Sequence, residues 1–361
     1  MEVPISKPLL TEEEIKAITD VLRSGRISQG EKVREFEKEF AKHHSVKHGI
    51  ATSSGTSALK IALEAAGIKK GDEVITTPFT FIATSNSILY NQGIPVFADI
   101  DEDTFNINPE EIRKQITPKT KALLIVHLYG LPCKMDEILE IKEEHGLVLI
   151  EDCAQALGAE YKGKKVGSFG DVSAFSFYPT KNITTGEGGM VLTNKEEIAE
   201  KARLIRNHGQ KENYRHEIIG YNYRMTDMQA ALGLVQLKKL DEMNEKRRRN
   251  AIILTELLRN TEGIKTPVCF NGAKHVYNQY TIKAEKRDKL FEFLNKNGIK
   301  ARIYYDRPVH MQPAYQKLGF KKGLCPVAEK VSEQVLSLPV YPLLEPRDME
   351  NIAEIVKRGL K

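Results

Sequence analysis

The feature that most constrains the fold of this chain is an alternation of short apolar runs and helical patterns between about residues 50 and 195. The apolar runs are near-continuous stretches of Val, Ile and Leu, which is typical of strands that are buried on both faces of a sheet. They lie at residues 73–77, 95–99, 122–126 and 147–152. Strand–helix–strand alternation of this kind predicts an α/β fold, with a mostly parallel sheet and helices on both of its faces.

Local helix signals fill the intervals between these runs. A stretch rich in Ala and Leu, Ser57–Ala66, stops at Gly67, and a helical pattern over 135–145 ends at Gly146. Glycine suits the position just beyond a helix C-terminus. Asn108 is followed by a proline and two glutamates, which is the order expected at a helix N-terminus.

A long helical pattern divides the chain into two parts. It opens with a capping box at Thr226, with Gln229 three residues later, and continues to about residue 260. We interpret this helix as a connector between a large domain over residues 1–235 and a smaller α/β domain over residues 236–361. The smaller domain is predicted to contain a strand at 275–284, a helix at 287–297, a strand at 299–305 and two further helices.

Composition excludes several classes of protein. Lys and Arg number 54 and Asp and Glu 49, and this excess of five positive charges over 361 residues is too weak to predict a nucleic-acid partner. The richest apolar run, residues 122–131, is too short to span a bilayer, so we expect no membrane partner. The four cysteines form no C-x-x-C pair, and the first residues contain no signal-type apolar core. These features predict a cytoplasmic protein in a reducing compartment.

Two segments are candidates for binding an anion and a charged group. Residues 52–57, Thr-Ser-Ser-Gly-Thr-Ser, precede a predicted helix, where free N–H groups can hold a phosphate, although ordinary helix capping explains the same pattern. Glu151 and Asp152 lie at the carboxyl end of a predicted strand. Ligands of open α/β sheets bind at that edge, although an Asp there can also cap the following turn.

Two further segments are candidates for catalysis. Lys181 leaves an apolar strand and enters a Gly-rich turn at 182–189. Burial there would lower its pKa from about 10.4 towards neutrality and give an amine that can form a Schiff base, whereas a solvated loop lysine would stay charged. The segment 220–224, Gly-Tyr-Asn-Tyr-Arg, is polar and aromatic and lies just before the long helix.

Other patterns are set aside. Residues 158–165 match seven places of a P-loop, but Lys165 replaces the Ser or Thr that would bind Mg²⁺. His44 and His48 lack a nearby third ligand, so we expect no metal site. Cys153 is interpreted as a packed thiol, and the basic run 246–249 as a solvated helix face. No G-x-G-x-x-G follows a strand, which argues against a nicotinamide dehydrogenase.

The order and spacing of the motifs nevertheless resemble one family along nearly the whole chain, from about residue 5 to 345. The motifs are SSGTSAL, GDEVITTPFTFIAT, PVFADID, VHLYG, EDCAQALGAEYKGKKVGSFGD, FSFYPTKNITTGEGG, RNHG, GYNYRMTDMQAA, HVYNQY and RPVHMQPAY. They resemble the DegT-type sugar-nucleotide aminotransferases, which are enzymes of fold type I that depend on pyridoxal 5'-phosphate (PLP). The resemblance implies a PLP cofactor, a large domain with a smaller C-terminal domain, and a homodimer with shared active sites.

The resemblance also implies roles for individual residues. Lys181 matches the lysine that binds the cofactor covalently, and Asp152 matches the acid that pairs with the pyridinium nitrogen. The residues that match other cofactor contacts are Gln155 at the ring hydroxyl, Phe81 on the ring face, Gly55, Thr56, Ser57 and Ser176 at the phosphate, and Asn222 at the phosphate of the neighbouring subunit. Tyr305 and His310 match a loop that faces the sugar, and Arg224, Arg206 and Arg26 are candidates for the nucleotide diphosphate.

The expected reaction is a two-stage transamination in which glutamate gives its amino group to a nucleotide-linked 4-ketosugar. Three segments resemble the 4-keto branch of the family, namely Ile27–Gly30, Thr184–Gly189 and Arg224–Gln229. Residues 304–308, Tyr-Tyr-Asp-Arg-Pro, resemble instead the branch that acts on 3-ketosugars, and this alternative stays open. A second alternative is a non-catalytic regulatory protein that binds PLP. Retention of Lys181 argues against the dehydrating members of the family, which have histidine there.

Overall fold

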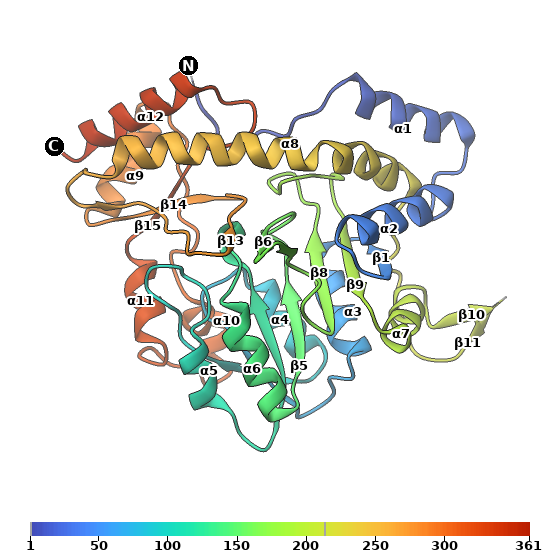
Figure 1. The fold of residues 1–361 in the computed structure, drawn as a ribbon. Helices are drawn as coiled ribbons and strands as arrows, with labels where there is room; N and C mark the ends of the chain where they lie inside the picture. Colours follow the sequence, from blue (N-terminus) through green and yellow to red (C-terminus); the bar gives the residue numbers. More distant parts are fainter. Residues whose placement is uncertain (1, 213) are drawn as a thin grey trace.

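The structure is a computed structural model that describes residues 2–212 and 214–361. Its centre is a seven-stranded sheet in the order β1-β9-β8-β5-β4-β2-β3, of which Figure 1 labels β1, β9, β8 and β5. The strands are β1 (His48–Thr52), β9 (Gly189–Thr193), β8 (Val172–Ser176), β5 (Val148–Asp152), β4 (Thr120–Val126), β2 (Glu73–Thr76) and β3 (Ile94–Phe97). Strand β9 is antiparallel to both of its neighbours, and the pairs from β8 to β3 are parallel. The predicted α/β fold with a mostly parallel sheet is therefore confirmed.

Helices cover both faces of this sheet because consecutive strand residues point to opposite sides. On β5, Leu149 packs into one apolar cluster and Ile150 into another. The cluster around Ile150 contains α3 (Gly55–Ala65) and α7 (Glu196–Arg206), and α4 (Ala83–Tyr90) packs against α3. The opposite face is covered by α5 (Pro109–Gln115), α6 (Met135–His145), α2 (Glu31–His43) and the first half of α8.

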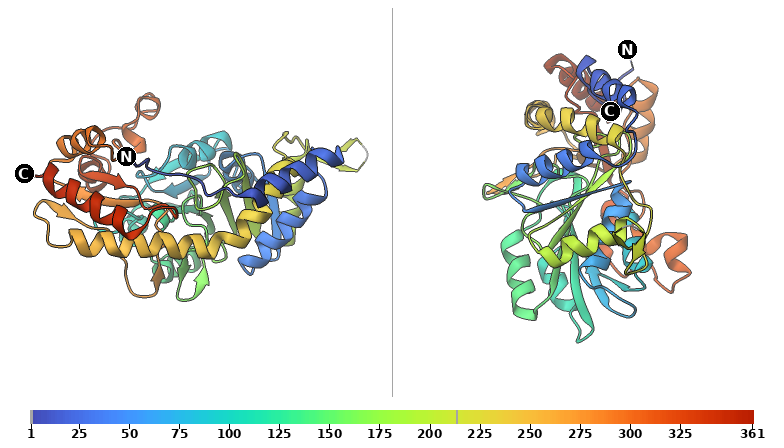
Figure 2. Two further views of the ribbon diagram at one scale, coloured as in Figure 1. Left: turned by 90° about the horizontal axis from the view of Figure 1, so that it is seen from above. Right: turned by 90° about the vertical axis from the view of Figure 1, so that its right-hand side faces the viewer.

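Helix α8 (Asp227–Leu258) runs across the molecule and touches both halves of the chain (Figures 1 and 2). Its N-cap is Thr226, whose side chain accepts from the Gln229 N–H, so the capping box expected from the sequence is present. One end of α8 packs against α1 (Glu12–Ser24) and α2, and the other end packs against α12 (Pro346–Gly359).

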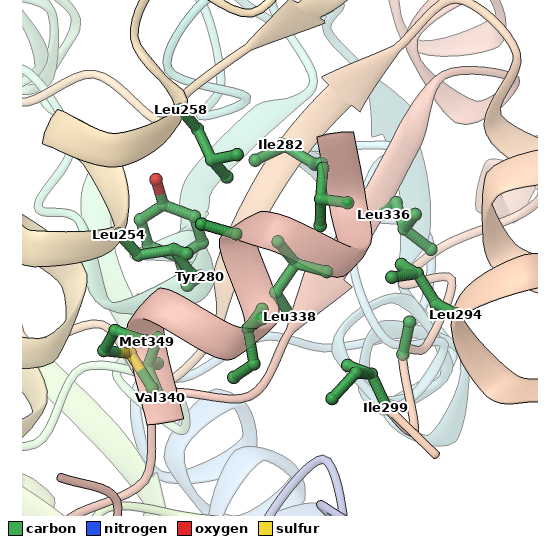
Figure 3. Close-up of a cluster of buried hydrophobic side chains, with 14 of the residues drawn as sticks. Leu254, Leu258, Tyr280, Ile282, Leu294, Ile299, Leu336, Leu338, Val340 and Met349 are labelled. Carbon is green, nitrogen blue, oxygen red and sulfur yellow. The ribbon is translucent and has the colours of Figure 1, made fainter. Parts of the chain in front are cut away.

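A second apolar core lies beside the far end of α8 (Figure 3). Tyr280, Ile282 and Leu338 from a small sheet meet Leu254 of α8 and Met349 of α12 in this core. The elements around it are β12 (Ile264–Lys265), β14 (Tyr280–Ala284), β15 (Val335–Leu338) and α9 (Arg287–Lys296). Val3 also packs here, and its N–H donates to the Gly298 carbonyl at 2.8 Å. The N-terminal segment therefore reaches across to the second core.

Two predicted strands in the C-terminal half are corrected by the structure. The strand expected at 299–305 is absent from the described structure, because Ile299 bridges only to Val3 and Arg302 only to Ser337. The strand expected at 275–284 begins at Tyr280, since the residues before it bond to the turn at Gly130 instead. The division of the chain at residues 235 and 236 stays a prediction.

The remaining elements are short. They are β6 (Glu160–Tyr161), β7 (Lys164–Lys165), β13 (Ala273–Lys274), α10 (Pro313–Gln316), α11 (Pro326–Ser332) and the hairpin β10 (Gln210–Glu212) to β11 (Arg215–His216). The hairpin projects beyond α7 at the edge of the molecule (Figure 1). Residues 158–165 form strands and a turn rather than a loop before a helix, which supports the rejection of a P-loop. Within the described residues, every helix is too short or too polar to serve as a membrane span.

Candidate active site

The candidate site lies at the carboxyl ends of β5 and β8. Asp152 is the last residue of β5, Ser176 is the last residue of β8, and Lys181 follows five residues later. The N-terminus of α3 meets the same edge, because a Cβ atom on Gly55 would lie 2.7 Å from the Cβ of Ser176. Four residues from three separate parts of the sequence are thus brought to one edge of the sheet, where ligands of parallel sheets bind.

The Asp152 carboxylate is buried and held in a fixed orientation. Its Oδ2 accepts the Thr84 hydroxyl at 2.9 Å, and its Oδ1 accepts the Ala154 N–H at 3.1 Å. Burial raises the pKa of this carboxyl, while those two hydrogen bonds and the charge of Lys181 act to lower it. The neighbouring Glu151 points to the other face, where it accepts the N–H groups of Gly167, Phe169 and Gly170. Of the two acids at this strand end, only Asp152 faces Lys181.

Lys181 is a half-buried amine in a tight turn. Its backbone N–H donates to the Tyr178 carbonyl at 2.9 Å. Burial lowers the pKa of Lys181 to about 8, although the negative charge of Asp152 opposes this shift. A substantial fraction of the side chain is therefore neutral near physiological pH, and a neutral amine is a nucleophile and a base. The sequence expectation for this residue included such a shift.

Gln155 is also fixed by its neighbours. Its Oε1 accepts the Tyr129 N–H at 2.8 Å, and its Nε2 donates to the Tyr305 hydroxyl at 3.0 Å. The Tyr129 hydroxyl in turn donates to the Tyr304 carbonyl. Burial raises the pKa of both Tyr129 and Tyr305, so both phenols stay protonated. The predicted residues Gln155 and Tyr305 are thus in direct contact.

The start of α3 is the segment that was predicted to bind an anion. Ser54 is the N-cap, and it forms a capping box with Ser57, whose hydroxyl accepts the Ser54 N–H at 2.9 Å. The Ser57 side chain is therefore engaged in capping. The first N–H groups of an α-helix lack intrahelical acceptors, so the backbone at Gly55 and Thr56 can donate to an anion. Phe81, which precedes α4, is 58% exposed.

Other predicted residues lie outside this cluster. His310 is fully buried, with its Nε2 2.8 Å from an oxygen of Glu329 and its ring beside Phe97. Arg206 is buried in an ion pair with Glu37 and donates to the Ala51 carbonyl, so its role here is internal. Arg26 is exposed at the turn between α1 and α2.

The segment 220–224 lies beside the α3 turn without entering the cluster. The Tyr223 carbonyl accepts the Ser53 N–H at 2.9 Å, and Arg224 donates to the Asn207 side chain at 2.7 Å. Tyr221 and Tyr223 stack on each other, with ring centroids 4.9 Å apart. Asn222 between them is exposed. Its side chain is therefore available to a second molecule.

Two residues that orient site side chains were not identified from the sequence. Thr84 orients Asp152, and Tyr129 orients Gln155. Both lie in motifs that the resemblance quoted, GDEVITTPFTFIAT and VHLYG, which are the only sequence signal for them. A separate correction concerns Arg247, which belongs to the basic run that was predicted to be solvated. That prediction is wrong at this position, since Arg247 is 4% exposed and α8 packs it towards the core.

The expectation of no metal site is not overturned by the cluster of His127, Glu151 and Cys153. His127 Nδ1 accepts the Cys133 N–H at 3.0 Å, and its Nε2 bonds to Glu151 at 3.0 Å. Burial raises the pKa of Cys153 well above its usual value, so this thiol stays protonated. Both ring nitrogens of His127 thus have partners within the protein. His44 and His48 lie on different elements, the end of α2 and β1.

Comparison with known proteins decides the family. The model of the DegT/DnrJ/EryC1/StrS aminotransferase family matches residues 8–357. The chain belongs to this family. It is therefore an aminotransferase that uses PLP, as the resemblance implied, and solved neighbours include PLP and PMP forms of a putative sugar aminotransferase from Streptococcus pneumoniae.

Relatives in this family have diverse names. A pleiotropic regulatory protein of Geobacillus stearothermophilus is 46% identical, over 96% of this chain and 94% of the relative. A UDP-N-acetyl-3-dehydro-alpha-D-glucosamine 3-aminotransferase of Acidithiobacillus ferrooxidans is 41% identical, over 97% and 95% of the two chains. A GDP-perosamine synthase of Vibrio cholerae is 38% identical, over 98% of each chain.

Solved structures share the fold of this aminotransferase. DesV from S. venezuelae, in complex with a ketimine intermediate, has a TM-score of 0.94 at 40% identity and covers 96% of this chain and 94% of its own. The fold class is thus fold type I, with a central sheet that is mostly parallel.

The residues of the cluster fit PLP. Asp152 is a buried acceptor for a pyridinium N–H. The free backbone N–H groups at the start of α3 suit a phosphate. The contact between Gly55 and Ser176 leaves no room for a side chain at residue 55, which permits close backbone approach there. Lys181 supplies the amine, and Phe81 supplies an exposed aromatic face.

Proposed function

We propose that this aminotransferase moves an amino group from glutamate to C4 of a nucleotide-linked ketosugar. The observation that carries the proposal is the pairing of a half-buried amine, Lys181, with a buried carboxylate, Asp152, beside a helix N-terminus. An amine, an acid and an anion-binding end are the three groups that a PLP-dependent transamination requires of its protein. The relatives that are named for aminotransfer to a nucleotide sugar support the choice of substrate class.

The cofactor contacts follow from this arrangement. Asp152 would hold the pyridinium nitrogen, and Gln155 would lie at the ring hydroxyl, with Phe81 on the ring face. The phosphate would be held by backbone at Gly55 and Thr56, with Ser57 and Ser176 beside it. When bound, PLP supplies an electron sink that stabilises negative charge at the carbon being deprotonated.

Lys181 would act as the acid and base of the reaction. Its Nζ would take the proton from Cα of the amino donor in the first half-reaction and deliver one to the sugar carbon in the second. A pKa of about 8 lets the same amine accept and release a proton near neutral pH. Asp152 keeps that amine from losing basicity altogether, because its negative charge raises the pKa of Lys181.

The choice of C4 depends on the three segments that resemble the 4-keto branch, and these segments contact one another. Asp227 accepts the Gly30 N–H at 2.8 Å, and its own N–H donates to the Ser28 carbonyl at 3.0 Å. Gln229 donates to the Glu187 carbonyl at 2.8 Å. The three segments thus behave as one unit at the N-terminus of α8, and that contact supports a common role in orienting the sugar.

Transfer to C3 is the second candidate. The 3-aminotransferase from Acidithiobacillus ferrooxidans is 41% identical to this chain, and Tyr305 of the Tyr304–Pro308 segment contacts Gln155. The test is to offer paired 3-keto and 4-keto sugars on UDP, GDP and dTDP, with glutamate and PLP, and to locate the new amine by NMR. Turnover confined to 3-keto substrates would overturn the C4 assignment, whereas the assignment as an aminotransferase would stand.

A regulatory role is addressed by the same preparation, since one relative has the name of a regulatory protein. An enzyme should lose the visible absorbance of its bound cofactor when glutamate is added. A regulator that only binds PLP should keep that absorbance, and this outcome would argue against catalysis.

A further inference from the structure

Arg247 is a buried cation without an internal partner. Its side chain lies in the middle of α8, and its Nε has no hydrogen-bond partner among the described residues. Burial is the influence that lowers its pKa to about 10, with no contribution from a neighbouring carboxylate. A buried charge is stable only when it is paired and hydrogen-bonded. The described residues therefore supply no counter-ion for Arg247.

The two arginines that follow it differ in this respect. Arg248 donates to the His275 carbonyl at 3.2 Å and lies 3.5 Å from Glu245. Arg249 donates to the Leu344 carbonyl at 3.1 Å. The Nε of Arg248 also lacks a hydrogen-bond partner, but Arg248 and Arg249 each donate to an internal carbonyl, and Arg247 has no such acceptor among the described residues. The difference makes Arg248 a matched control.

Arg247 and Lys181 line a common cavity. Arg247 lines two small cavities, each of about 10 Å³. Lys181 lines one of these cavities, and Thr180 and Tyr304 line the other. Arg247 therefore reaches both sides of the turn that carries Lys181. Among the described residues that line the two cavities, none is an Asp or a Glu.

We propose that Arg247 binds the α-carboxylate of the amino donor, an inference that rests on the proposed transamination. The planar guanidinium matches a carboxylate in charge and in geometry. The α-carboxylate is bonded directly to the carbon that Lys181 deprotonates, whereas the sugar diphosphate is attached across the ring from C4. Each cavity has room for about one water-sized group, which suits a carboxylate oxygen better than a diphosphate.

The competing interpretation is a structural arginine that is solvated by buried water. Asn278 Oδ1 and Gln279 Oε1, which line one of the cavities, also lack hydrogen-bond partners. Water that bridges these oxygens to Arg247 would satisfy all three groups. In that case the loss of Arg247 would strand the two acceptors and destabilise the fold.

The first experiment compares Arg247→Gln and Arg248→Gln in cofactor-free protein. We expect Arg247→Gln to melt no lower than wild type, because no internal ion pair is lost, and Arg248→Gln to melt lower. We also expect 2-oxoglutarate to raise the melting temperature of wild type and Arg248→Gln, but not that of Arg247→Gln. A lower melting temperature for Arg247→Gln, with 2-oxoglutarate stabilisation retained, would overturn the proposal in favour of the structural role.

The second experiment separates the two half-reactions by the absorbance of the cofactor. In Arg247→Gln, the glutamate concentration for half-maximal conversion should rise about 10- to 100-fold, the range expected for loss of a charged hydrogen bond. The reaction of the pyridoxamine phosphate form with ketosugar should change less than about threefold, a shift below that range. A larger effect on the ketosugar step would assign Arg247 to the diphosphate instead. A wild type that is inert to glutamate in this assay would contradict the proposed function, whereas the 2-oxoglutarate stabilisation would still report on Arg247.

Discussion

At the scale of single residues, the proposed chemistry depends on Lys181. We predict that Lys181→Ala folds, binds PLP without a covalent link and does not turn over. Acid–base assistance alone is worth about 10²–10⁴-fold, and this lysine would also be the covalent attachment point. Borohydride reduction followed by mass spectrometry measures the covalent link, and a coupled glutamate assay measures turnover. Residual activity above about one percent of wild type would contradict the role of Lys181 as acid and base.

The ionisation of Lys181 gives a prediction about pH. Its folded pKa of about 8 lies below the ordinary value of 10.5, so the neutral amine should become the majority form as pH rises through about 8. Competitive acetylation of cofactor-free protein, read by mass spectrometry, should show Lys181 reactivity increasing over that window. Exposed lysines such as Lys69 serve as the internal reference for the reagent.

Asp152→Asn provides the control for the direction of this shift. The Asp152 charge raises the pKa of Lys181, so its removal should lower that pKa further and move the reactivity profile to lower pH. A profile that moves to higher pH would contradict the electrostatic coupling between the two residues.

Residue identity could be predicted from the sequence more reliably than residue environment. Asp152 and Lys181 were found because a strand end and a Gly-rich turn are local signals. Arg247 was misjudged because burial depends on which elements pack over α8, and four basic residues in a row give no sign of it. His310 was expected in a substrate-facing loop, and the structure buries it against Glu329.

At the scale of elements, the N-terminus of α3 gives a prediction about cofactor affinity. A Cβ at residue 55 would lie 2.7 Å from the Cβ of Ser176, which is closer than real side chains approach. Gly55 is the first residue of the helix, where alanine is otherwise favourable, so Gly55→Ala should weaken PLP binding through this contact. We expect the Kd of cofactor-free protein for PLP to rise about tenfold or more, which corresponds to about 1.4 kcal/mol.

The double variant with Ser176→Gly checks the physical reason. Removal of the Ser176 side chain opens the space that the new methyl group needs, so part of the affinity should return. If Gly55→Ala binds PLP as tightly as wild type, the α3 turn is not a phosphate site. If the double variant is no better than Gly55→Ala, the loss has another cause.

The elements themselves were predicted best where their signals are local. Helix α6 and the capping box of α8 match the expected residues, since Gly146 and Thr226 act through neighbours in the chain. The strand at 299–305 failed because strand pairing is non-local. Residues 299 and 302 meet different partners, Val3 and Ser337, and no pattern within the segment records that.

At the scale of the whole molecule, Asn222 is the predicted cofactor contact that lies apart from the others. Asn222 is exposed between two stacked tyrosines, and the turn that carries it is bonded to Ser53 at the start of the α3 region. The segment resembles one that reaches the phosphate of a neighbouring subunit. We propose a two-fold homodimer in which each site takes Asn222 from the other copy, since a two-fold axis makes such an exchange reciprocal.

This arrangement predicts rescue between two inactive variants. Lys181→Ala lacks the amine, and Asn222→Ala lacks the group that its partner needs. In a mixed dimer, the site that keeps Lys181 receives an intact Asn222, and the other site carries both defects. Random exchange of equal amounts gives mixed dimers in about half of the molecules, so activity should recover to about a quarter of wild type. The measurement is turnover after subunit exchange, with exchange verified by native mass spectrometry of differently tagged chains.

A pairing of Lys181→Ala with Asp152→Asn is the control. In every dimer of that mixture each site carries one of the two defects, because both residues serve the same subunit, so activity should stay at the level of the separate variants. No recovery in the test mixture would place Asn222 in its own subunit's site, and recovery in the control would contradict the assignment of Lys181 and Asp152 to one site.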